Sequence, residues 1–376
     1  MIDFIPVNEP LLNGNEKKYL DECIDTGWIS SEGPFIKRFE EGIASMAGRK
    51  YAVAVANGTA AIDAAVTALG IGRYDEVIVP AFTIISCLTQ IIRLGARPVL
   101  VDSDRITWNM DVSQIESKIT SKTKAIMIVH IYGLPVDVDP VLALAKKYGL
   151  KVIEDAAEMH GQTYRGRPCG SFGDISTFSF YANKHITTGE GGMIVMDDEA
   201  LFEKCRSYRN LCFQPQKRFV HEELGWNMRM TNLQAALGVA QLEKLDQFVA
   251  RKRDMGKGYT ERFSDLEKYV QLPLVKTEYA ENIYWVYGMV LKDQIRFGAD
   301  VAMKKMGDFG VGTRPFFYPM HKQPVFQKMG LFEKESFPVA EWLAERGFYI
   351  PSGLALSEDQ MEKVVETVKR IFDEHC

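Results

Sequence analysis

Short apolar runs alternate with helical patterns between about residues 50 and 200. Seven of these runs have the length and composition of β-strands, at 51–57, 76–80, 98–102, 124–132, 151–155, 175–181 and 192–196. Several are apolar without interruption, which is typical of strands that are covered on both faces. Helical patterns such as 60–69 and 138–148 lie between them. The alternation predicts an α/β fold built on a mostly parallel sheet.

The pattern changes in the last third of the chain. A long helical pattern runs from Thr231 to about Arg262, followed by a strand pattern at 284–291 and a helix at 301–309. The final helical pattern, 358–374, carries its apolar residues on one face. These elements predict a smaller α+β domain. We therefore expect a large domain at 1–245, including the N-terminal segment, and a small domain at 246–376.

Composition narrows the classes of function. The chain of 376 residues is 46% hydrophobic and 25% charged, as in ordinary globular proteins. Its net charge of −5 gives no sign of a nucleic-acid or membrane surface as the main partner. The N-terminus lacks a signal-peptide pattern, and no apolar stretch approaches the roughly 20 residues that span a bilayer. Six scattered cysteines form no Cys-x-x-Cys pair, so we expect no metal site and a cytoplasmic location.

The strongest chemical signal is a lysine and an aspartate that follow buried-strand patterns. Lys184 closes the apolar run that begins at 175, and Asp155 ends the strand pattern 151–155. Ligands of α/β sheets collect at the carboxyl ends of strands, where both side chains would lie. This pair is what a pyridoxal-phosphate (PLP) enzyme requires. The lysine forms a Schiff base with the cofactor, and the aspartate keeps the pyridinium nitrogen protonated so that the ring accepts electrons.

A candidate phosphate site lies where the strand pattern 51–57 meets the next helix. Gly58 lets the backbone approach an anion closely, Thr59 can cap the helix, and free N–H groups at the helix start bind phosphate. Ser179 lies five positions before Lys184 and can add a hydroxyl to the same phosphate. Each of these residues alone has an ordinary structural explanation. Their order on one α/β sheet favours a cofactor site, and the chain carries no P-loop motif that would compete.

At these positions the sequence resembles the DegT/DnrJ/EryC1/StrS family of PLP-dependent sugar aminotransferases. The resemblance covers nearly the whole chain and is carried by 26–33, 55–61, 75–80, 129–133, 153–158, 179–192, 225–230 and 313–321. It implies the aspartate-aminotransferase fold (fold type I), with a mixed, mostly parallel sheet, flanking helices and a smaller α+β C-terminal domain. One position departs from the family pattern. Ile84 stands where an aromatic residue often stacks on the cofactor ring, which leaves Ile84 or Phe82 to cover it.

The resemblance also implies roles for individual residues. Lys184 corresponds to the lysine that binds the cofactor and carries the proton, and Asp155 to the partner of the pyridine nitrogen. Asn227 matches a residue that reaches the phosphate of the neighbouring subunit, which implies a homodimer with shared active sites. The further cofactor ligands that the resemblance implies are Gly58, Thr59 and Ser179 at the phosphate and Glu158 near the 3′-hydroxyl.

Within the family, the resemblance is closest to C4 aminotransferases of the perosamine type. These act on a nucleotide-linked 4-keto-6-deoxyhexose, such as GDP-4-keto-6-deoxymannose. The implied amino donor is L-glutamate, and the implied product is an amino sugar for O-antigen, another polysaccharide or a glycoside. Candidate contacts with the sugar or its diphosphate are His160, Arg229, Tyr318 and His321. Among them, Arg229 can hold a carboxylate or phosphate with two hydrogen bonds.

Three other functions stay open at this point. The first is C3 amination of a nucleotide-linked 3-keto sugar. The second is a sugar 3-dehydratase of the same family, which uses pyridoxamine phosphate and has histidine in place of the lysine. Because His185 follows Lys184, an alignment to the family motif that is shifted by one residue would place histidine at the catalytic position. Counting from Ser179 keeps Lys184 at that position. The third is a PLP-binding regulator without activity, which the intact Lys184–Asp155 pair disfavours.

Overall fold

A seven-stranded sheet with the strand order β1-β9-β8-β5-β4-β2-β3 forms the centre of the fold. The computed structural model describes residues 4–214 and 216–375. β9 is antiparallel to both of its neighbours, whereas the other neighbouring strands are parallel, so the sheet is mixed and mostly parallel as predicted. The strands are β1 (Tyr51–Val55), β2 (Glu76–Pro80), β3 (Arg97–Val101), β4 (Thr123–Val129), β5 (Lys151–Asp155), β8 (Ile175–Ser179) and β9 (Gly192–Met196).

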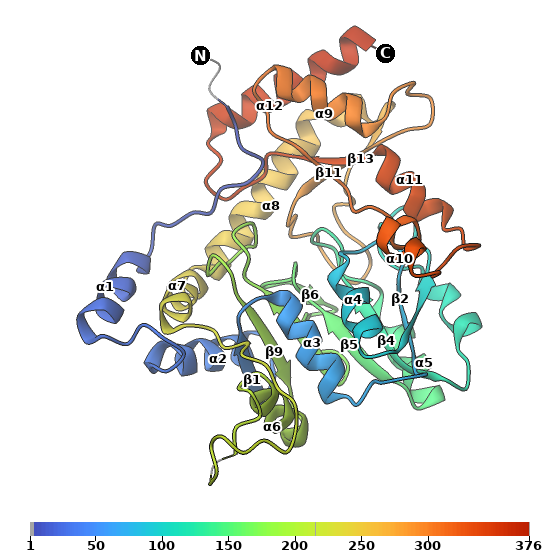
Figure 1. Cartoon of the computed structure of the whole chain (residues 1–376). Helices are drawn as coiled ribbons and strands as arrows, with labels where there is room; N and C mark the ends of the chain where they lie inside the picture. Colours follow the sequence, from blue (N-terminus) through green and yellow to red (C-terminus); the bar gives the residue numbers. More distant parts are fainter. Residues whose placement is uncertain (1–3, 215, 376) are drawn as a thin grey trace.

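Helices cover both faces of this sheet (Figure 1). Successive side chains of a strand point to opposite faces, so in β4 Ile126 and Ile128 join one core while Ala125 and Met127 join the other. This two-sided burial is why the strands read as uninterrupted apolar runs. The first core contains α1 (Glu16–Thr26), α2 (Pro34–Met46), α5 (Val138–Tyr148) and α7 (Asn232–Leu242), and the second contains α3 (Gly58–Ala68), α4 (Ser86–Arg93) and α6 (Glu199–Tyr208).

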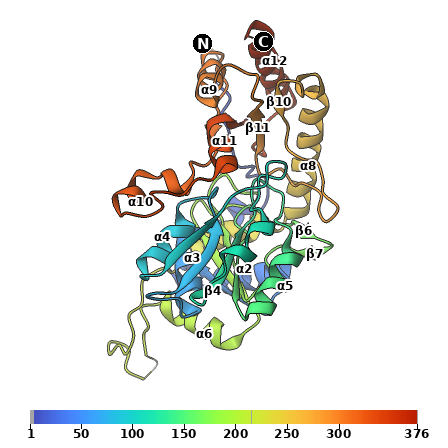
Figure 2. The same cartoon turned by 90° about the vertical axis from the view of Figure 1, so that its right-hand side faces the viewer.

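The small domain is built on a four-stranded antiparallel sheet, β10-β11-β13-β12. Figures 1 and 2 show it above the large sheet, with α8 running from one domain to the other. Its strands are β10 (Val270–Gln271), β11 (Tyr287–Leu291), β12 (Arg314–Pro315) and β13 (Gly347–Ile350). Its helices are α8 (Leu245–Arg262), α9 (Ala299–Asp308), α10 (Pro324–Lys328), α11 (Pro338–Arg346) and α12 (Glu358–His375).

Two features of the structure have no counterpart in the sequence patterns. The single helical pattern at 231–262 is two helices, α7 and α8, separated by Glu243 and Lys244. No glycine or proline marks this break, so the sequence carries no stop signal there. In addition, Ile5 pairs with Val311 and is buried in the core of the small domain. The start of the chain therefore crosses to the domain from which the predicted division separates it.

The remaining strands, β6 (Thr163–Tyr164) and β7 (Arg167–Pro168), form a two-stranded antiparallel pair. Within residues 4–214 and 216–375, no helix combines the length and the apolar surface that crossing a membrane requires.

Candidate active site

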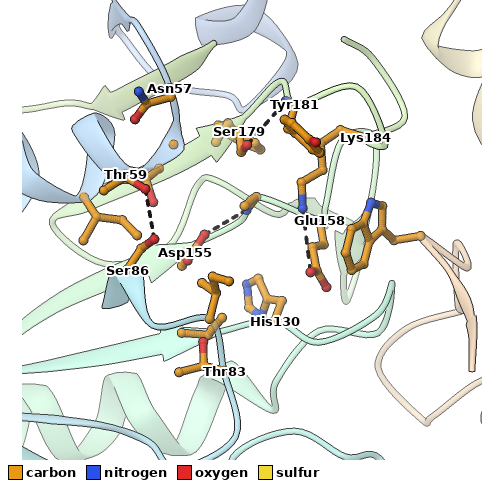
Figure 3. Close-up of a pocket in the computed structure, with 18 of the residues that line it drawn as sticks. Asn57, Thr59, Thr83, Ser86, His130, Asp155, Glu158, Ser179, Tyr181 and Lys184 are labelled. Carbon is orange, nitrogen blue, oxygen red and sulfur yellow. Dashed lines mark hydrogen bonds and ion pairs between the residues drawn. The ribbon is translucent and has the colours of Figure 1, made fainter. Parts of the chain in front are cut away.

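A cavity of about 420 Å³ opens where several strands of the large sheet end. β1 and β8 are both antiparallel to β9, and β5 is parallel to β8, so the carboxyl ends of β1, β5 and β8 share one edge. Asn57, Asp155 and Ser179 follow or end these strands and line the cavity. Trp285 and Tyr349 line it from the small domain, so both domains form the site. Figure 3 shows Lys184, Asp155 and Glu158 drawn together in this space.

Lys184 reaches the cavity from the turn that follows β8. Its amine lies 3.7 Å from Glu158 Oε1 and 3.8 Å from the centroid of the Trp285 ring, and only 10% of the side chain is exposed. Burial lowers the pKa of the Lys184 ammonium, and the nearby carboxylates Glu158 and Asp155 oppose this shift. A lysine amine that loses its proton more readily than a solvated one can act as a nucleophile and as a base.

Asp155 is the last residue of β5 and is buried. Its Oδ1 accepts a hydrogen bond from the N–H of Ala157 at 3.0 Å, and its Oδ2 accepts one from the Cys87 thiol at 3.4 Å. Burial raises the pKa of Asp155, while these two hydrogen bonds and the charge of Lys184 oppose the shift. The carboxylate is therefore fixed in orientation at the cavity wall.

Glu158 is the second buried carboxylate of the cavity. Its Oε2 accepts a hydrogen bond of 2.6 Å from the N–H of Tyr132, whose φ of +56° turns the backbone in the left-handed region. Burial raises the pKa of Glu158 to about 7, with Lys184 opposing. Glu158 is thus the ion-pair partner of Lys184 and changes its charge near neutral pH.

The N-terminus of α3 forms an anion cradle opposite these groups. Asn57 caps the helix by accepting a hydrogen bond from the N–H of Ala60 at 2.8 Å, and the first N–H groups of a helix lack partners within it. The Thr59 hydroxyl lies 2.9 Å from that of Ser86 at the start of α4. A Cβ on Gly58 would lie 2.8 Å from Ser179 Cβ, so only glycine allows β8 to bring the Ser179 hydroxyl this close.

The chain matches the model of the DegT/DnrJ/EryC1/StrS aminotransferase family over residues 10–369. It belongs to this family. It is 41% identical to the GDP-perosamine synthase of Escherichia coli O157:H7 over 371 residues, with 99% of each chain covered. It is 40% identical to the GDP-perosamine synthase of Vibrio cholerae, with 98% of this chain and 99% of the relative covered.

Solved structures of aminotransferases share the whole fold. An aminotransferase from Psychrobacter cryohalolentis superposes with a TM-score of 0.92 at 31% identity, and the match covers 99% of both chains. The aminotransferase TlmJ from Streptoalloteichus hindustanus gives 0.91 at 28% identity, with 98% of this chain and 99% of that chain covered. The predicted fold class is therefore confirmed.

Aminotransferases of this family depend on PLP, and the cavity fits that cofactor. The helix start with Gly58 and Thr59 offers a phosphate cradle, and Asp155 and Lys184 offer the pyridine and aldehyde partners. Thr177 Oγ1 lines the same cavity, and it is buried with no hydrogen-bond partner among the described residues. A buried polar atom without a partner is costly, which indicates that a ligand normally contacts this wall.

The structure does not bring every predicted substrate contact to the cavity. His160 is fully buried and stacks against Phe178 and Phe180, with ring centroids 5.5 and 5.3 Å apart, because its side chain turns into the core. His321 is 3% exposed and lies 2.9 Å from Glu341 through Nε2. Neither His160 nor His321 is among the residues that line the cavity. Tyr318 is 52% exposed and is not among the residues that line the cavity.

Asn227 and Arg229 lie next to the cradle on a separate surface. Arg229 pairs through its backbone with Val55 at the end of β1, and its guanidinium donates to Asn227 Oδ1 at 2.9 Å. Arg229 lines a second, polar cavity of about 580 Å³ together with Arg206, Arg209 and Arg218. Contact of Asn227 with a neighbouring subunit stays a prediction.

Several lining residues escaped the sequence analysis. Ser86 adds a hydroxyl to the cradle, and His130 adds an imidazole ring whose Nδ1 accepts from Val136 N–H and whose Nε2 faces Glu154 Oε1, both at 3.0 Å. The sequence left either Ile84 or Phe82 to cover the cofactor ring. The structure favours Ile84, because Ile84 lines the cavity and Phe82 is fully buried in the core. Trp285 and Tyr349, which line the cavity from the small domain, gave no local signal.

Proposed function

We propose that this protein transfers an amino group from L-glutamate to the 4-keto carbon of a nucleotide-linked 4-keto-6-deoxyhexose. The observation that carries the proposal is the placement of Lys184 between Glu158 and Trp285 in a cavity that also holds Asp155 and the α3 cradle. The GDP-perosamine synthases that are about 40% identical over their full length support a GDP-linked sugar of this kind.

PLP, when bound, supplies an electron sink for the carbon–nitrogen chemistry of amino transfer. The chain's own groups prepare that chemistry. Lys184, whose pKa is lowered by burial, would take up and return the proton that amino transfer moves between the substrate carbon and the cofactor. Asp155, held by Ala157 and Cys87, would keep a proton on the ring nitrogen of the bound cofactor. The hydroxyls of Thr59 and Ser179 and the start of α3 would hold the cofactor phosphate.

The walls of the cavity limit the access of water to the reacting amine. Trp285 is 4% exposed and covers the Lys184 amine, while Ile84 lines the cavity from the large domain. Exclusion of water strengthens the pairing of Lys184 with Glu158, because charges interact more strongly in a medium of low dielectric constant.

The alternatives find less support. A 3-dehydratase of this family has histidine at the catalytic position, but here Lys184 lines the cavity while His185 is buried and faces the carbonyl of Ile283 at 3.2 Å. This register favours the lysine chemistry. C3 amination differs only in the carbon presented to Lys184, and the perosamine synthase relatives favour C4.

The assembly and location belong to the same proposal. We infer a homodimer in which Asn227 contacts the cofactor phosphate of its partner, with Arg229 and Tyr318 available to the sugar diphosphate. Asn227 is exposed and accepts a hydrogen bond from Arg229, and a guanidinium can bind a phosphate with two hydrogen bonds. The five described cysteines are all free thiols, which supports a reducing, cytoplasmic environment.

The decisive experiment offers the purified protein glutamate and a panel of GDP-, dTDP- and UDP-linked 4-keto-6-deoxyhexoses. Mass spectrometry should detect a product in which nitrogen replaces the keto oxygen, and NMR should place that nitrogen on C4. Nitrogen on C3 would support the 3-keto alternative, and a deoxygenated product without nitrogen would support the dehydratase. Absence of any half-reaction with amino acids would refute amino transfer and support the PLP-binding regulator.

A further inference from the structure

Trp285 contacts the amine of Lys184, and the proton-transfer and cofactor-binding roles described so far do not involve this tryptophan. Lys184 Nζ lies 3.8 Å from the centroid of the indole, well inside the range of a cation–π interaction. Trp285 is 4% exposed, so this contact is largely shielded from water. The faces of tryptophan rings attract ammonium groups more strongly than those of tyrosine or phenylalanine.

Three contacts hold the indole in this position. Its Nε1–H donates to the backbone carbonyl of Asn183 at 2.9 Å, directly before the lysine. Its ring stacks on Tyr132, with centroids 5.8 Å apart and an interplanar angle of 29°. Its backbone carbonyl accepts a hydrogen bond of 3.0 Å from the amine of Lys252, a buried residue of α8. Lys252 also donates to the carbonyl of Ser352, so it joins two segments of the small domain.

We propose that Trp285 is a further active-site residue, which stabilises the protonated form of the Lys184 amine, and that Lys252 is the positioning residue that holds Trp285 there. The proposal rests on the proposed function only for the role of Lys184 as proton carrier.

The groups around Lys184 explain why an uncharged ring is useful. Glu158 and Asp155 both favour the protonated amine, but Glu158 has a pKa raised by burial to about 7 and loses its charge near neutral pH. His160 and His185 have pKa values lowered by burial, so both rings are neutral. The attraction of the indole does not depend on pH. It therefore keeps part of the stabilisation of the ammonium when Glu158 is protonated.

The test measures the pKa of Lys184 directly in the full-length chain freed of cofactor. Trace labelling with acetic anhydride across pH, followed by peptide mapping, gives the titration of this one amine. Trp285→Leu should lower the pKa of Lys184 by roughly half a unit to one and a half units, from the range of cation–π strengths. Trp285→Phe should give a smaller decrease, because the benzene ring attracts cations less strongly.

Controls separate this role from general damage to the fold. Trp342→Phe alters an indole of α11 that pairs with Arg105, and it should leave Lys184 unchanged. Lys252→Met should lower the pKa of Lys184 as Trp285→Leu does, and Lys252→Arg should restore it. If Lys252 acted only through its positive charge, its removal would raise the pKa of Lys184, because a nearby positive charge disfavours the ammonium form.

An unchanged pKa of Lys184 in folded Trp285→Leu would overturn the proposal. If that variant does not fold, Trp285→Phe decides in the same way. Lack of product in the sugar panel would refute the proposed function and would leave this titration untouched, so the two failures are distinguishable.

Discussion

The substitution Gly58→Ala tests most directly whether the start of α3 binds the cofactor phosphate. The alanine Cβ would lie 2.8 Å from Ser179 Cβ and 3.2 Å from Ser179 Oγ, whereas carbon atoms in ordinary contact lie about 3.5–4.0 Å apart. Ser179 must therefore move back, and its hydroxyl leaves the cradle. A hydrogen bond to a charged group contributes about 1.5–3 kcal/mol. At about 1.4 kcal/mol for each factor of ten, Gly58→Ala should weaken PLP binding by roughly 10- to 150-fold.

Titration of the cofactor-free protein with PLP, followed by absorbance, measures this loss. Gly72→Ala is the matched control, since a Cβ there meets nothing within 4 Å, and it should bind PLP as the wild type does. Ser179→Ala should lose a similar amount, and Gly58→Ala/Ser179→Ala should lose little more than either single variant because both remove the same hydroxyl. Wild-type affinity of a folded Gly58→Ala variant would refute the assignment of this helix start as the phosphate site.

Three further predictions concern the ionisable groups of the cavity. Lys184→Ala should keep the circular dichroism spectrum of the wild type but lose turnover and the absorbance of lysine-bound cofactor. Borohydride reduction of the wild type, followed by peptide mapping, should locate the cofactor on Lys184. A label on another lysine would contradict the assignment. Asp155→Asn should retain the cofactor while kcat falls by roughly 100-fold or more, and near-normal turnover would exclude its role at the ring nitrogen. Because burial raises the pKa of Glu158 from 4.5 to about 7, the folded state binds this proton more tightly than the unfolded state. The free energy of unfolding of the wild type relative to Glu158→Gln should therefore fall by up to about 3 kcal/mol as pH rises from 4.5 to above 7. Urea unfolding measures this difference between the two proteins, and an equal difference at pH 4.5 and pH 8 would disprove the prediction.

The parts of the site that the sequence revealed are those that depend on local pattern. Asp155 and Ser179 end strands that are buried on both faces, and such strands are visible as apolar runs. The predicted bounds of β2, β5 and β9 match the structure for the same reason. Gly58 and Thr59 stand at a strand-to-helix junction, where the order of the residues alone indicates an anion site.

The parts that escaped prediction depend on packing between distant segments. Trp285 and Tyr349 reach the cavity only because the small domain packs against the large sheet, and nothing within their own segments marks that contact. The placement of His160 also depends on packing. It follows Asp155 closely in the chain, but its side chain turns into the core against Phe178 and Phe180. Proximity in sequence did not determine which side of the backbone faces the cavity.

The three ionisable groups of the cavity depend on one another for the stability of their charges. Burial lowers the pKa of Lys184 and raises those of Asp155 and Glu158, so each charge is unfavourable alone and is offset by its neighbours. Removal of one partner leaves the others buried without compensation, which costs more than the pair itself contributes. A cofactor that binds Lys184 and pairs with Asp155 relieves part of this cost, and it binds the folded chain rather than the unfolded one. PLP should therefore raise the unfolding midpoint of the wild type by more than that of Asp155→Asn, since linkage ties stabilisation to affinity.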